Sequence, residues 1–384
     1  MAIYNMNDFM RLSAVINYQI SAKHIDWNNV INIILSRRTI SDESKNILHL
    51  LLEYSSEAYG KKKRRLGPLA ILHPLRATAL LARVADEPDL LNLMTILLHD
   101  NFEDIKPKRV EIDMWIRKEK KFQKVLQMIT ETDRWFLIER LKWLTKEPTE
   151  TYYRYIGRLI KHSGKTPEVI RVKLADRLDN TLDMRIEYED PLQKVDFFEI
   201  LFQMLYSNIY TGFEPEFPHP PPATLNGVQR LYQLFKNTVL MSLIRQKQAA
   251  KDDEKAQTIF YHLARASMRE AQRIALHIFS YHERDIKIAR ELLLDTMNYV
   301  RGGGIDMVTP RVANQKLDGL FVSTFDEVNK KRREKKLAEL YTDKHLMVQA
   351  AVAFIVMFLN FINDPEYYVK GITEEGVHPE PQNY

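Results

Sequence analysis

The sequence predicts an all-α fold, and two observations support this. Apolar residues recur at helical spacing through most of the chain, and few segments alternate in the manner of strands. Glycine is sparse, with 12 residues in 384, which argues against a turn-rich β fold. The chain is also long enough for two domains and a sizeable core. We therefore expect a helical bundle followed by a second helical region.

The N-terminal elements are expected to be short amphipathic helices over residues 8–60. Ser41 is suited to begin one of them, because a serine side chain can cap the free backbone N–H groups of a helix start. A basic loop, 61–68, follows. His73 and Pro74 then open a helix that runs to Arg83, since proline is tolerated in a first helical turn.

The next helix is expected from Leu90 to Asp104, after a break at residues 86–89. Residues 110–165 are charged and helical in pattern. The spacing of apolar residues over 169–178 predicts a helix that carries Asp176 and Asn180 on one face.

A proline-rich run at residues 214–222 cannot continue a helix and is the best candidate for a domain boundary. The polar, proline-bearing end of the chain is expected to be loosely ordered. The predicted organisation is an N-terminal helical segment 1–44, a first domain 45–213, a linker 214–225, a C-terminal helical domain 226–364 and a tail 365–384.

Residues 347–362 are almost entirely apolar and require a membrane check. The run is shorter than the roughly 20 residues that a spanning helix needs, and Gln349 and Asn360 bracket its centre. We therefore expect a buried helix and no membrane partner. Phe354, Phe358 and Phe361 form a helical stripe that is most simply core.

Composition limits the chemistry. The absence of cysteine excludes disulfides, thiolate zinc sites and cysteine nucleophiles, and fits a reducing, cytoplasmic setting. The formal net charge of +5 is mild for this length, so it suits anionic ligands without requiring nucleic acid. The N-terminus lacks a basic leader followed by an apolar run, so no signal peptide is expected.

The most informative stretch is His99-Asp100, followed by Glu103 and Asp104. Adjacent His and Asp side chains can both turn toward one divalent ion, and the two later carboxylates lie one helical turn further on. His73 lies upstream and Asp176 downstream. A single histidine on an apolar helix is more often an ordinary core residue, but the joint pattern favours a metal site.

Such a donor set suits Mn²⁺, Fe²⁺ or Zn²⁺. A bound ion would acidify water and neutralise phosphate charge, while Glu103 and Asp104 could orient that water or accept its proton. The basic run 61–65 lies just before His73, so we favour its contact with a polyphosphate over a simply solvated loop. Within it, Arg64 could stack on a base while pairing with phosphate. A second basic run, 330–336, is expected to be a solvated helix face.

These residues resemble the HD-domain phosphohydrolases, and within them the hydrolase domain of the RelA/SpoT alarmone enzymes. The resemblance covers about residues 45–205. It rests on family order and similar spacing at Arg64, His73-Pro74, Leu98-His99-Asp100-x-x-Glu103-Asp104 and Lys173-Leu174-Ala175-Asp176-Arg177-Leu178-Asp179-Asn180.

The resemblance implies a fold and a set of roles. The fold is an HD-domain helical bundle, and the reaction is removal of pyrophosphate from the 3′ position of guanosine 3′,5′-bis(diphosphate). Mn²⁺, or another divalent transition metal, would be the cofactor. The implied metal ligands are His73, His99, Asp100 and Asp176; the implied water-activating residues are Glu103 and Asp104; the implied substrate-binding residues are Arg64, Arg65 and Asn180.

The chain also departs from the family pattern. Leu69-Ala70 stands where Pro-Tyr is frequent, Asp179 where a His is usual, and Asp183 where Thr is common. The metal set is thus complete, whereas the nucleoside pocket differs. No Gly-Arg-x-Lys segment like that of the family's synthetase domain is present.

Three hypotheses follow. The first is hydrolysis of a guanosine alarmone, and the second is hydrolysis of another phosphorylated nucleotide, such as NADPH or a nucleoside triphosphate. The third is a non-catalytic nucleotide-sensing or scaffolding protein. In each case a phosphorylated nucleotide is the ligand, and the C-terminal half could bind a protein partner or a second copy of the chain.

Overall fold

The computed structural model describes residues 6–64, 69–105, 112–183, 195–207, 227–283, 285–301 and 316–377. Helices dominate these residues, and extended pairing within them is confined to two isolated bridges, Lys63–Leu69 and Ile372–Val377. The predicted all-α fold is therefore confirmed. The chain forms two compact units: unit 1 comprises Met1–Glu150, Arg158–Leu182 and Ala249–His262, and unit 2 comprises Thr151–Gly157, Asp183–Gln248 and Leu263–Tyr384.

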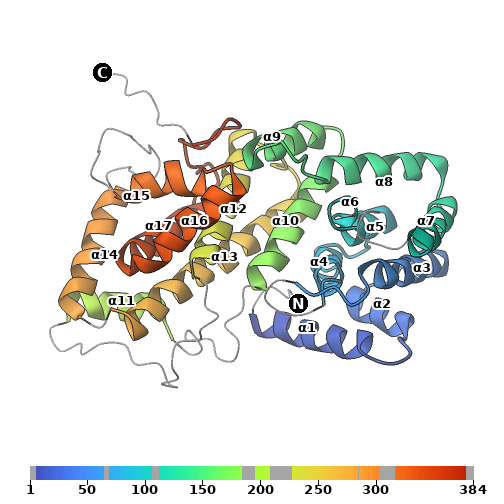
Figure 1. Ribbon diagram of the computed structural model, residues 1–384, viewed down its shortest axis with the longest axis horizontal. Coiled ribbons are helices and arrows are strands. Elements are labelled where there is room, and N and C mark those ends of the chain that lie inside the picture. The colour runs from blue at the N-terminus through green and yellow to red at the C-terminus, as the bar shows by residue number, and fades with distance from the viewer. Residues whose placement is uncertain are drawn as a thin grey trace. The chain divides into compact units, whose positions relative to one another are not determined.

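Unit 1 is a bundle built around helix α4 (Figure 1). Every residue of α4 is buried, and α4 packs against α1, α2, α5 and α10. Its helices are α1 (Met6–Ile20), α2 (Trp27–Leu35), α3 (Asp42–Tyr59), α4 (Leu72–Ala82), α5 (Leu90–Leu98), α6 (Asn101–Asp104), α7 (Ile112–Gln127), α8 (Glu131–Leu144) and α10 (Glu168–Leu182). Two further helices, α9 (Tyr152–Ser163) and α13 (Glu254–Tyr281), contribute residues to both units.

Local sequence explains where these helices begin. Ser41 caps α3 by accepting a hydrogen bond from the backbone N–H of Ser44, as predicted. Asp89 caps α5 in the same way, through the N–H of Asn92. Helix α4 begins at Leu72, so Pro74 lies in the first turn, where its missing N–H costs no helical hydrogen bond.

The single helix predicted from Leu90 to Asp104 is wrong. Helix α5 ends at Leu98, and α6 begins at Asn101. Asp100 lies between them with φ −91° and ψ 2°, a backbone conformation outside the α-helical region. In a continuous helix, successive side chains diverge by about 100°. The break lets His99 and Asp100 point toward the same place.

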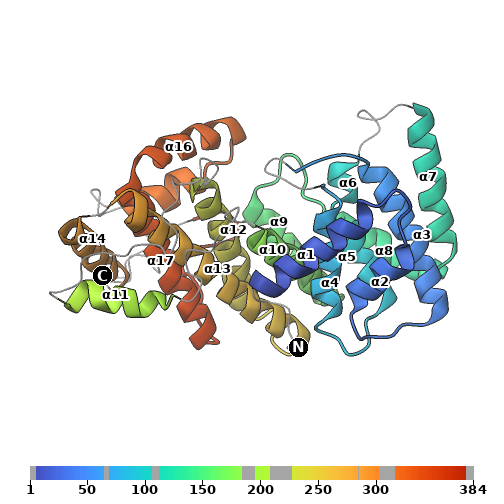
Figure 2. The ribbon, with the colours of Figure 1, turned by 90° about the horizontal axis from the view of Figure 1, so that it is seen from below.

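Unit 2 is assembled around α17, which packs against α12, α14 and α16 (Figure 2). Phe354, Phe358 and Phe361 of α17 are buried, which agrees with the predicted core stripe. Its elements are α11 (Phe197–Tyr206), α12 (Gly227–Gln246), α14 (Ile286–Arg301), α15 (Lys316–Gly319), a π-helical segment (Leu320–Phe325), α16 (Lys330–Thr342) and α17 (Lys344–Asn363).

Helix α17 is long and apolar enough to cross a membrane by length and composition, but 61% of its most apolar window is buried within the protein. This burial agrees with the predicted core helix. The basic run 330–336 lies on α16 and is mostly exposed, as expected of a solvated face.

Residues 365–377, the described part of the predicted tail, differ from the expected loose order. Val369, Ile372 and Val377 are all buried. Gln246 of α12 also donates a hydrogen bond to the carbonyl of Ile372 at 2.8 Å. These few apolar side chains, spaced between polar residues, are enough to anchor the segment. The predicted linker 214–225 lies outside the described residues, and the predicted domain boundaries stay predictions.

Candidate metal centre

Four side chains from separate parts of unit 1 bring their donor atoms together. The Nε2 of His73 lies 3.2 Å from the Nε2 of His99, 3.4 Å from an oxygen of Asp100 and 3.2 Å from an oxygen of Asp176. The Nε2 of His99 lies 3.3 Å from the other oxygen of Asp100 and 3.6 Å from that of Asp176. The set is the one predicted from the sequence.

These separations fit a single divalent cation. With metal–ligand distances of about 2.1 Å, two donors lie about 3.0 Å apart at a right angle and about 3.4 Å apart at the tetrahedral angle. The observed values, 3.2 to 3.6 Å, are close to this range. His73, His99 and Asp176 are also buried, so a cation between them would be largely withdrawn from solvent. The residues present therefore fit a metal ion.

Each ligand comes from a defined position on a helix. His73 lies in the first turn of α4, whereas His99 and Asp100 occupy the break between α5 and α6. Asp176 lies in the middle of α10, which packs beside α4 (Figures 1 and 2). Because these helices are packed into the core, the four side chains start from rigid positions.

Both histidines present the same ring nitrogen to the centre. The Nδ1 of His99 lies 2.7 Å from the carbonyl oxygen of Ile96, and the Nδ1 of His73 lies 2.6 Å from an oxygen of Asp179. A carbonyl and an ionised carboxylate can only accept, so each Nδ1 carries a proton. In the neutral ring this leaves Nε2 with its lone pair, which is the form that binds metal.

Several charged groups surround the imidazole ring of His73. Burial and the nearby Arg64 lower its pKa, but the carboxylates of Asp179, Asp100 and Asp176 outweigh them and raise it well above 6.5. Burial raises the pKa of Asp176, but the Nζ of Lys173 and the hydrogen bonds to His73 and His99 outweigh it and hold this pKa well below its usual range. The carboxylates around the His73 ring thus favour a positive charge at this position, and a divalent cation would supply one.

Asp179 lies behind the centre in a pair with Arg76, and both side chains are fully buried. The Nε and Nη2 of Arg76 donate to the two oxygens of Asp179 at 2.8 and 3.2 Å. The Nη1 of Arg76 donates to the hydroxyl of Ser13 at 3.2 Å, and its guanidinium lies 5.0 Å from the ring centre of Phe9. Burial raises the pKa of Asp179, but Arg76 and His73 outweigh it and lower the value to about 2.

The two predicted water-activating residues lie on α6, directly after Asp100. An oxygen of Asp104 pairs with the Nζ of Lys62 at 2.7 Å. The Oε1 of Glu103 accepts a hydrogen bond from the backbone N–H of Lys146 at 2.7 Å, in the loop between α8 and α9. Asp104 and Glu103 thus each form a hydrogen bond with a residue that is not one of the four candidate ligands.

The predicted substrate contacts lie beside the ligands. The Nη2 of Arg64 donates to the side-chain oxygen of Asn180 at 2.7 Å, and the amide nitrogen of Asn180 donates to Asp176 at 2.6 Å. The Nζ of Lys173 pairs with the second oxygen of Asp176 at 2.8 Å. Arg64 is therefore linked to a ligand through Asn180. Arg65, the remaining predicted contact, lies outside the described residues.

Several residues of this centre were missed from the sequence. Arg76 could have been found, because a lone arginine in an otherwise apolar helix requires a buried counter-charge. Tyr59, which is buried, carried no such signal. Burial and then the charges of Asp100 and Asp104 raise the pKa of its hydroxyl well above 10. Lys62 was visible only as a member of a basic run, and Lys173 only as the first residue of the motif that contains Asp176.

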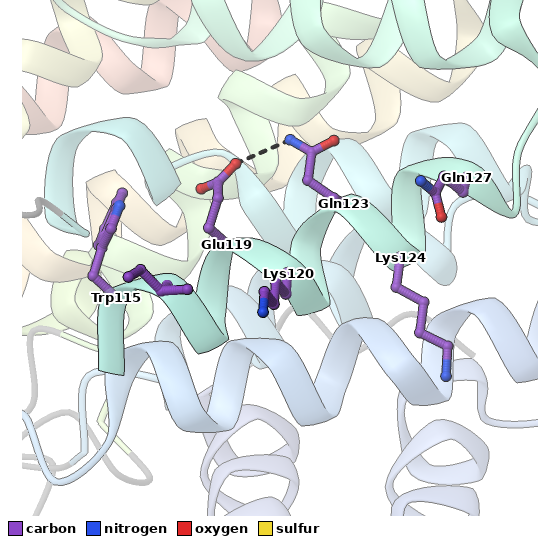
Figure 3. A pocket seen from close by; sticks show the side chains of 7 residues that line it. Trp115, Glu119, Lys120, Gln123, Lys124 and Gln127 are labelled. Atoms are coloured by element: carbon purple, nitrogen blue, oxygen red, sulfur yellow. Dashed lines mark hydrogen bonds between the residues drawn. The ribbon is translucent and has the colours of Figure 1, made fainter. Parts of the chain in front are cut away.

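A surface hollow lies on α7, apart from the ligand set (Figure 3). All of its lining side chains belong to that one helix, and they include Trp115 and Lys120. The Nε2 of Gln123 donates to Glu119 within it at 2.9 Å. None of the four candidate ligand residues lines this hollow.

Comparison with known proteins finds relatives of part of the chain. No family model matches the chain. A stretch of 143 residues, 37% of the chain, is 29% identical to a guanosine-3′,5′-bis(diphosphate) 3′-pyrophosphohydrolase of Aquifex aeolicus, and a stretch of 124 residues, 32% of the chain, is 30% identical to a GTP pyrophosphokinase of Streptomyces coelicolor. The matches cover 18% and 13% of these relatives, so the chain spans less than a fifth of their lengths. Over about a third of its length, the chain is similar to enzymes of guanosine nucleotides.

Proposed function

We propose that this chain is a metal-dependent phosphohydrolase of a phosphorylated nucleotide. Guanosine 3′,5′-bis(diphosphate) is the first candidate substrate, with hydrolysis at its 3′-pyrophosphate. The observation that carries the proposal is that the Nε2 atoms of His73 and His99 lie 3.2 Å apart, and that each lies 3.2 to 3.6 Å from an oxygen of Asp100 and an oxygen of Asp176. The name of the Aquifex aeolicus relative supports the substrate.

The proposed cofactor is Mn²⁺, held by His73, His99, Asp100 and Asp176. The mixture of imidazole and carboxylate donors suits this ion or another divalent transition metal. When bound, the cation supplies a Lewis acid that polarises the phosphoryl group and acidifies the attacking water.

The surrounding side chains have separate proposed roles. Lys62 and Arg64 place positive charge next to the ligands and would attract the phosphates. Arg64 also contacts Asn180, and together these two residues would orient the nucleoside. Asp104 and Glu103 are carboxylates at the edge of the centre, and we assign them the acceptance of the water proton.

The reaction balances without a further reactant. Water adds to the phosphorus of the 3′-pyrophosphate, and the bond from that phosphorus to the 3′ oxygen breaks. One carboxylate takes the proton from water, and the 3′ oxygen leaves with a proton. Pyrophosphate and a nucleoside 5′-polyphosphate are the products.

The test is release of pyrophosphate by the purified full-length chain with Mn²⁺. We expect turnover by the wild type, its loss in Asp100→Ala, and its retention in Asp253→Asn. Asp253 is the matched control because it pairs with Arg171 at 2.6 Å in the same unit, away from the ligands. No turnover of any nucleotide with metal present would contradict the proposal.

A substrate panel separates the alternatives. Leu69, Ala70 and Asp183 differ from the family pattern, so NADPH and nucleoside triphosphates belong in the same assay. A strict preference for the 3′-pyrophosphate excludes these substrates. Tight nucleotide binding without hydrolysis would instead favour the sensing or scaffolding role.

A further inference from the structure

The departure at Asp179 has a structural role of its own. Its oxygen lies 2.6 Å from the Nδ1 of His73, and its side chain is fully buried. It therefore does not line an open nucleoside pocket. A carboxylate in this position fixes which ring nitrogen of a histidine carries the proton, and it holds the ring in one orientation.

Arg76 fixes Asp179 in turn. Both carboxylate oxygens accept hydrogen bonds from one planar guanidinium, which defines the plane of the carboxylate as well as its position. The guanidinium is held at its other side by the hydroxyl of Ser13 and the ring of Phe9, both from α1. These contacts link α1 to Arg76 of α4, Arg76 to Asp179 of α10, and Asp179 back to His73 of α4.

The spacing of residues on α4 and α10 explains why these contacts form a closed network. His73 and Arg76 are three residues apart on α4, and Asp176 and Asp179 are three residues apart on α10. Residues at this spacing lie on one helix face. One turn of each helix supplies the ligands, and the next supplies the buried pair.

We propose that Asp179 and Arg76 are positioning residues for metal binding: they hold His73 in the tautomer and orientation that direct its Nε2 to the cation. The inference rests on the proposed function, since it presupposes that His73 binds a metal. The substitution Asp179→Asn would disturb the arrangement, because an amide can donate to Nδ1 and so favour a proton on the Nε2 that faces the ion. Such support typically contributes a factor of about 10 to 100 in metal affinity.

The experiment measures the Mn²⁺ dissociation constant by calorimetry for four proteins at one pH. They are the wild type, Asp179→Asn, the double variant Arg76→Met/Asp179→Asn, and the control Asp253→Asn. The double variant guards against misfolding, because it leaves no unpaired arginine in the core. We expect the single and double variants at position 179 to bind about 10- to 100-fold more weakly, and the control to bind within about twofold of the wild type.

A second measurement needs no variant in the site. In the wild type with diamagnetic Zn²⁺, ¹⁵N NMR of the imidazoles should show His73 protonated at Nδ1 and metal-bound at Nε2. Metal at Nδ1 would overturn the proposal, as would a folded double variant that binds Mn²⁺ as tightly as the wild type. If the wild type itself binds no divalent metal, the proposed function has failed as well; if it binds and the variants match it, only the positioning role is lost.

Discussion

Replacement of Arg76 by methionine should destabilise unit 1 severely. The guanidinium is fully buried, bonds both oxygens of Asp179 and contacts Ser13 and Phe9. Removing one partner of a buried ion pair leaves the other charge uncompensated, at a cost of about 3–5 kcal/mol. The remaining partners of Asp179 are then His73, whose ring is already surrounded by acidic groups, and the Nη1 of Arg64 at 4.0 Å.

The double variant Arg76→Met/Asp179→Asn should recover most of this loss. With both charges removed, no ion remains buried without a partner, and the free energy of unfolding should return to within about 1–2 kcal/mol of the wild type. The pair would then show a strong coupling energy, because the two substitutions together cost less than Arg76→Met alone.

The assay is urea unfolding followed by tryptophan fluorescence. All four tryptophans lie in the range Met1–Glu150, so the signal reports on unit 1. With a slope of about 2 kcal/mol per M of urea, the loss corresponds to a midpoint lower by about 2 M. Lys45→Met is the control, because the ion pair of Lys45 with Asp42 is exposed and should contribute at most about 1 kcal/mol. A cost below about 1 kcal/mol for Arg76→Met, or a double variant less stable than the single one, would refute the reasoning.

Three further outcomes are expected. Free Mn²⁺ at about 100 times its dissociation constant should stabilise unit 1 by about 2.7 kcal/mol, and EDTA or Asp176→Ala should abolish the shift in the urea midpoint. Arg64→Gln removes the guanidinium and its positive charge, and should lower kcat/KM for the nucleotide by about tenfold or more with Mn²⁺ affinity unchanged; an equal loss of metal affinity would argue against a substrate role. Burial, with His282 nearby, lowers the pKa of His277 to about 4, so the unfolded chain binds a proton below about pH 6.5 that the folded one does not. Protection of α13 amides from hydrogen exchange should therefore fall as pH drops from about 6.5 toward about 4 in the wild type, and His277→Gln should flatten that dependence.

The sequence was sufficient for features that depend on local chemistry. Ser41 and Asp89 were identifiable as helix starts because capping needs only a side chain and the next turn of backbone. The stripe of Phe354 and Phe358 was identifiable because helical periodicity alone places those rings on one face. The four candidate ligands were identifiable as a set because their residue types and order carry the chemistry.

The break at His99 and Asp100 was not predictable in the same way. The apolar run ends at Leu98, but the stretch contains no glycine or proline that would mark the end of a helix. What favours the break is contact with distant residues. His99 and Asp100 both face His73 of α4, and His99 also faces Asp176 of α10.

Asp179 shows how a departure from the family's sequence pattern can be misinterpreted when only the sequence is known. An aspartate where the family usually has a histidine suggested a change in the nucleoside pocket. Asn180 accepts a hydrogen bond from Arg64, whereas Asp179 bonds His73 and Arg76 and lies 4.0 Å from the Nη1 of Arg64. The departure therefore concerns the support of the candidate metal centre. Substrate preference is then a question for Arg64, Asn180 and Asp183, and that is where substitutions should change the choice of nucleotide without changing the affinity for metal.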